Sequence, residues 1–75
     1  MKNAYVGTLL IQSERHSVNE LLSLNTKYEV KGIRIHDETV SQVYLNIPAP
    51  DRELQRKYES TFPGCYTQMM FEKKI

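Results

Sequence analysis

Residues 40–47, Val-Ser-Gln-Val-Tyr-Leu-Asn-Ile, alternate between apolar side chains and polar or aromatic ones. A period of two residues is typical of a β-strand that buries one face and leaves the other open. The buried face would carry Val43, Leu45 and Ile47, and the open face Gln42, Tyr44 and Asn46. This segment therefore predicts a sheet with one face packed against helices and one face free.

The residues before this strand predict that it belongs to a β-hairpin. Residues 28–35 form a second apolar segment, and the polar residues 36–39 favour a turn between the two. The alternation changes phase near Gly32, which indicates a β-bulge. We expect a hairpin with one dry face, and we expect Arg34 and His36 beside the open-face residues of the partner strand.

Two further strands are expected, one toward each end of the sequence. Residues 4–11 are largely apolar at odd and even positions alike, which is typical of a central strand buried on both faces. Residues 66–71, Tyr-Thr-Gln-Met-Met-Phe, predict the last strand. Within it, Met69 and Phe71 would lie on one face and Met70 on the other.

Two helices are expected between the strands. Ser17 and Glu20 have the spacing of a capping box, so a short helix should begin there and end near Asn25. A second helix should follow Pro50 and end before Pro63. Its narrow apolar stripe consists of Leu54, Tyr58 and Phe62.

The resulting order of elements, β-α-β-β-α-β, is the split βαβ or ferredoxin-like arrangement. It predicts an α+β fold with a four-stranded antiparallel sheet and both helices on one face. The chain of 75 residues is expected to form a single domain over residues 1–75. A domain of this size buries only about 60% of the surface that its unfolded chain exposes, so a homodimer or another partner could supply further burial.

The composition limits which cellular compartment and which partners are expected. Ten Lys and Arg against nine Asp and Glu give a net charge of +1, so no strong field attracts nucleic acid or a membrane. The single cysteine, Cys65, cannot form an internal disulfide, which favours a reducing compartment. The apolar run at residues 4–11 is too short to span a bilayer and lacks a cleavage site. We expect a cytoplasmic protein without a membrane partner.

Residue patterns that carry enzyme chemistry are missing from the sequence. It has no Gly-rich phosphate loop, no G-x-S-x-G elbow and no H-E-x-x-H motif. Cys65 and His16 could form a nucleophile and base, but no spacing brings them together. The two histidines and one cysteine are too far apart for a zinc site. We therefore expect no catalytic residue, no metal and no cofactor.

Residues 4–9, Ala-Tyr-Val-Gly-Thr-Leu, resemble the first-strand consensus of RNA-recognition motifs, and the expected element order is similar. In that family two alternate positions of the third strand are aromatic; Tyr44 matches one of them, and Gln42 occupies the other. The resemblance implies single-stranded RNA stacked on Tyr5 and Tyr44. The chain departs from the family at residues 40–42, where the consensus has a basic residue and Gly.

Two functions follow from these observations. The first is a small non-catalytic interaction protein, an inhibitor, adaptor or regulator that binds a larger protein through the open sheet face or an edge strand. Small stand-alone domains of this kind are common among phage and mobile-element proteins. The second is the RNA-binding domain that the resemblance implies. The residues expected to contact a partner are Tyr5, Arg34, His36, Gln42 and Tyr44.

Overall fold

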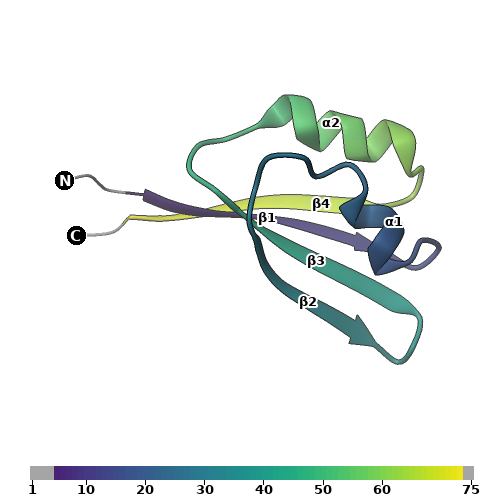
Figure 1. The fold of residues 1–75 in the computed structure, drawn as a ribbon. Helices are drawn as coiled ribbons and strands as arrows, with labels where there is room; N and C mark the ends of the chain where they lie inside the picture. The colour runs from purple at the N-terminus through teal and green to yellow at the C-terminus, as the bar shows by residue number, and fades with distance from the viewer. Residues whose placement is uncertain (1–4, 74–75) are drawn as a thin grey trace.

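Six elements follow one another along the chain in the computed structural model, which describes the backbone of residues 5–73 and the side chains of residues 7–71. They are β1 (Tyr5–Ser13), α1 (Val18–Leu22), β2 (Val30–His36), β3 (Val40–Ile47), α2 (Arg52–Thr61) and β4 (Tyr66–Lys73). The strands form one antiparallel sheet in the order β2-β3-β1-β4, and the helices lie over one of its faces (Figure 1). The expected α+β class, with four antiparallel strands in one sheet and two helices, is confirmed.

The central position of β1 explains why its residues are apolar on both faces. β1 pairs with β3 on one side and with β4 on the other. Leu9 and Ile11 face the helices and are fully buried, while Thr8 and Leu10 on the opposite face are also buried. The prediction of a central strand is confirmed.

The core lies between the helices and the sheet. β3 contributes every second residue, as its alternation predicted, and Tyr58 of α2 joins it together with Phe62, the C-cap residue of that helix. Within it the hydroxyl of Tyr58 on α2 donates a hydrogen bond of 2.5 Å to the carbonyl of Leu21 on α1. This bond ties the two helices to each other. The buried cluster consists of Leu9, Ile11, Leu21, Val43, Leu45, Ile47, Tyr58 and Phe62.

Helix α1 begins as predicted but ends early. The hydroxyl of Ser17 accepts from the amide of Glu20, and the Glu20 carboxylate accepts from the amide of Ser17, which completes the capping box. The helix ends at Leu22 rather than near Asn25. The Asn25 side chain instead bonds both the amide and the carbonyl of Tyr28, which stabilises a turn in place of another helical turn.

The expectation of a hairpin with one dry face is wrong for β2. Ile33 and Ile35 lie opposite Val43 and Ser41 of β3 and share their face, but they are 47% and 61% exposed. The physical reason is the position of the helices: α1 has only five residues and packs over β3, and α2 packs over β4. Neither helix covers β2, which is the edge strand farthest from α2 in Figure 1.

The turn between β2 and β3 contains two residues in an unfavourable backbone conformation. Asp37 and Glu38 have φ angles of 51° and 61°, in the left-handed region that favours Gly and Asn. The change Glu38→Gly is therefore expected to raise the free energy of unfolding by about 0.5–1 kcal/mol, measured by urea unfolding. Gly64→Ala, at a φ of 90°, is the reciprocal control and should destabilise the fold. A loss of stability in Glu38→Gly would contradict the prediction.

Candidate functional site

Four of the five residues singled out in the sequence lie together on the open face of the sheet. Arg34 on β2 is the register partner of Gln42 on β3. The Oε1 atom of Gln42 lies 2.8 Å from His36 Nε2 and accepts a hydrogen bond of 3.1 Å from the Tyr44 hydroxyl. The side chain of the fifth residue, Tyr5, lies outside the described residues.

This group continues across the sheet to β4. Gln42 donates through Nε2 to Gln12 Oε1 on β1 at 2.7 Å, and Gln12 is the register partner of Tyr66 on β4. Tyr66 is exposed and was missed at the sequence level, although the alternation of residues 66–71 would have placed it with Met70 on this face. The centre of the open face thus carries three neutral side chains that are hydrogen-bonded to one another, those of Gln12, Gln42 and Tyr44.

Two positively charged side chains extend from β2 over the open face. The Nζ atom of Lys31 donates to the hydroxyl of Thr8 at 2.8 Å, which places this ammonium group on the open face. Arg34 lies one row further along the strand. Among residues 7–71, no carboxylate forms an ion pair with either side chain. Their charge is therefore available to a partner.

The exposed large apolar side chains of the described residues all lie on the two edge strands. On β2 they are Val30, Ile33 and Ile35, and on β4 they are Tyr66, Met70 and Phe71. Because β2 has β3 on one side only, the backbone amides and carbonyls that point away from β3 have no strand to pair with. The β2 edge thus combines free backbone groups with exposed apolar side chains.

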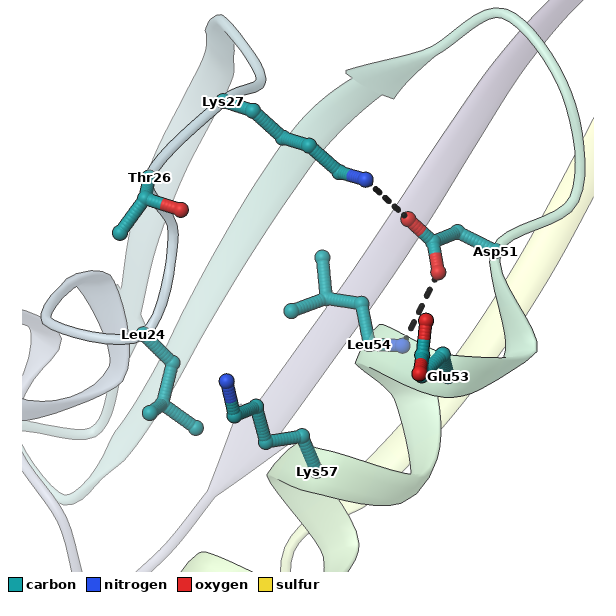
Figure 2. Close-up of a pocket in the computed structure, with 7 residues that line it drawn as sticks. All are labelled: Leu24, Thr26, Lys27, Asp51, Glu53, Leu54 and Lys57. Atoms are coloured by element: carbon teal, nitrogen blue, oxygen red, sulfur yellow. Dashed lines mark hydrogen bonds and ion pairs between the residues drawn. The ribbon is translucent and has the colours of Figure 1, made fainter.

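A separate hollow of about 300 Å³ lies between the loop after α1 and the start of α2. Figure 2 shows Lys27 reaching from the loop to Asp51, which caps α2. Asp51 accepts from the Tyr28 hydroxyl at 2.7 Å, from the Leu54 amide at 3.0 Å and from Lys27 Nζ at 3.2 Å. The carboxylate therefore joins the loop to the helix, and both of its oxygens are engaged in structural contacts.

Asp51→Ala is expected to lower the free energy of unfolding by about 1–2 kcal/mol, because the helix cap and the link to the loop are lost together. The Tyr28 hydroxyl, followed by the Leu54 amide, holds the pKa of Asp51 below its ordinary value of 3.8. The contribution of this group is therefore present above about pH 4 and is lost as the pH falls further. Urea unfolding between pH 2 and pH 7 measures both effects. Asp51→Asn keeps the cap and should lose only the pH-dependent part; equal stability of the Asp51→Ala variant and the wild-type protein would refute the link.

Cys65 and His16, considered above as a nucleophile and base, each have structural contacts of their own. Burial raises the pKa of the Cys65 thiol, which also donates to the carbonyl of Tyr58 at 3.5 Å. A raised pKa lowers the thiolate fraction that a nucleophile needs. The His16 ring packs on Phe62 with centroids 4.7 Å apart, and its Nδ1 atom lies 3.5 Å from Glu20.

Neither a metal-binding cluster nor a membrane-spanning helix occurs among the described residues. No three His, Cys, Asp or Glu side chains of these residues gather closely enough to hold a metal ion. No helix in the described part of the chain has both the length and the apolar character needed to cross a bilayer.

Comparisons with protein-family models, with curated proteins and with solved structures gave no significant match. The function is therefore inferred from the residues of this chain alone.

Proposed function

We propose that the protein is a small non-catalytic binding protein of ferredoxin-like fold, which acts as an inhibitor, adaptor or regulator of a larger protein. It would bind by pairing its β2 edge with an extended segment of that partner. The fold assignment is supported by the order of the six elements and by the core that the two helices share on one face of the sheet. An added strand would receive backbone hydrogen bonds from β2 and specificity from its side chains.

The observation that carries this proposal is the exposure of Ile33 and Ile35 on an edge strand. Proteins usually protect such edges, and an exposed apolar edge strand attracts other chains. Here the isoleucines lie on the face that helices cover elsewhere in the sheet, so a partner strand would extend the core beyond β2. Arg34 and His36 on the opposite face would contact the same partner.

RNA binding is the second candidate, and one arrangement favours it. Tyr44 and Tyr66 share the open face, and Lys31 and Arg34 extend over it from β2. Aromatic rings on a sheet can stack single-stranded bases while neighbouring cations contact the phosphates. This function would depend on the two tyrosines and would weaken steeply with salt.

Affinity capture with three matched proteins distinguishes the two functions. The tagged wild type, the edge variant Ile33→Ser/Ile35→Ser and the face variant Tyr44→Ala/Tyr66→Ala are incubated with host lysate, with and without nuclease. The proposal expects a stoichiometric protein that survives nuclease, remains with the face variant and is lost from the edge variant. RNA that is lost from the face variant would establish the second candidate instead. A doubled mass in light scattering of the purified wild type would identify a homodimer.

A further inference from the structure

We propose that the β2 edge selects an acidic strand, that is, an extended segment in which apolar and acidic side chains alternate; this inference rests on the proposed function. The two sides of β2 differ in chemistry, and a strand paired alongside it would have to match both. One side is apolar and the other is positively charged.

The helix side of β2 requires apolar partners. Ile33 and Ile35 are two residues apart, so a paired strand would place its alternate side chains beside them. An open hollow of about 540 Å³ adjoins this side; its apolar part is formed by Ile35 and Val18, and the rest of its lining is polar, from residues 14–17, 19, 38, 39 and 41. It exists because α1 is too short to cover β2. One aliphatic side chain of an added strand, placed next to Ile35, would enter it.

The open side of β2 requires negative charge. Lys31 reaches this side through its bond to Thr8, and Arg34 and His36 lie on it beside Gln42. β2 itself contains no acidic residue. Every second side chain of a paired strand would lie on this face beside Arg34, where a carboxylate is attracted and an ammonium group is repelled. The Lys31 ammonium, which extends inward to Thr8 of β1, adds positive charge to the same face farther from the edge. The edge therefore discriminates by charge as well as by its apolar side chains.

A second copy of this chain would pair with the β2 edge less favourably than an acidic strand. In the antiparallel register that pairs Ile33 of each copy with Ile35 of the other, Arg34 lies directly opposite Arg34 of the other copy. Like charges at directly opposed positions destabilise a strand pair. An acidic strand has no such conflict.

The test compares two capped seven-residue peptides, one alternating Glu with Val and the other alternating Lys with Val. Each is titrated into the whole isotope-labelled protein, and binding is followed by the backbone amide signals. We expect the Glu-Val peptide to bind at least tenfold more tightly than the Lys-Val peptide, with shifts centred on residues 30–36. Raising the salt from 50 mM to 500 mM should reduce this preference.

Charge reversal supplies the matched variants. Lys31→Glu/Arg34→Glu is expected to invert the preference in favour of the Lys-Val peptide. Arg52→Glu/Arg56→Glu makes the same change in net charge on exposed positions of α2 and should leave the preference unchanged. Amide spectra of each variant confirm folding, and the salt dependence of the wild type gives a second readout that needs no variant.

The outcomes separate this inference from the proposed function. Equal binding of both peptides at β2, or tighter binding of the Lys-Val peptide, would overturn the acidic preference and leave edge pairing intact. Absence of binding by either peptide at millimolar concentration would overturn both. Self-association with shifts at β2 in the peptide-free protein would show that a second copy occupies the edge, which also overturns the acidic-strand assignment.

Discussion

Tyr58→Ala is expected to lower the free energy of unfolding by about 3–5 kcal/mol, because it removes the largest fully buried side chain of the described core. The change also removes the hydrogen bond that joins α2 to the carbonyl of Leu21 on α1. A domain of 75 residues has a total stability of about 4–11 kcal/mol. Urea unfolding followed by circular dichroism should therefore find that this variant has lost a large fraction of its stability.

Tyr58→Phe isolates the role of the hydroxyl. It keeps the ring and is expected to cost about 1–3 kcal/mol, since a buried carbonyl loses its donor. Burial raises the pKa of Tyr58 to about 12 from its ordinary value of 10.0. Between these pH values the unfolded chain loses the proton and the folded protein keeps it, so stability falls as the pH rises. Tyr58→Phe should remove that part of the alkaline slope; a neutral effect of this variant would mean that other contacts hold α1.

Gly7→Ala is expected to lower the free energy of unfolding by about 2–3 kcal/mol through overpacking. A methyl group at this position would lie 2.5 Å from the carbonyl oxygen of Ile47 and would overlap the ring of Phe71. The carbonyl belongs to the strand next to β1 and has little freedom to move, whereas the ring could rotate only by leaving its place over the glycine.

Gly32→Ala is the matched control for this substitution. Gly32 also lies in a strand, but a methyl group there meets no atom within 4 Å. The free energy of unfolding of the Gly32→Ala variant should stay within about 0.5 kcal/mol of the wild-type value in the same urea titration. Similar losses in both variants would indicate a general intolerance of side chains rather than the packing of Phe71 on Gly7. The packing of Phe71 thus explains why a glycine occupies position 7 of the first-strand motif, without reference to RNA.

Features that depend on neighbouring residues could be predicted from the sequence. The alternation of residues 40–47 correctly separated the buried face of β3 from its open face, and the spacing of Ser17 and Glu20 correctly placed the start of α1. Both patterns involve interactions within a few residues, which the sequence records directly. The phase change near Gly32 likewise corresponds to the register shift between Val30 and Gly32.

The exposure of β2 could not be predicted in the same way. Ile33 and Ile35 have the residue types and spacing of a buried face, and only the reach of the helices decides whether they are covered. That reach depends on where α1 ends, which is set by the turn that Asn25 makes with Tyr28. The side-chain turn and one more helical turn differ little in free energy. This small difference determines which surface is left uncovered, and the proposed function depends on that surface.

The position of β1 between β3 and β4 has a consequence for synthesis of the chain on the ribosome. β1 is the first described strand and β4 the last, so the sheet cannot be completed until residues 66–73 have been made. Pairing between such distant segments slows folding. Until then the edges of the sheet are β2 and β1 rather than β2 and β4, and the unpaired side of β1 lies next to the apolar core residues Leu9 and Ile11. Molecular chaperones are therefore expected to engage the protein before β4 emerges and to release it once β4 has paired.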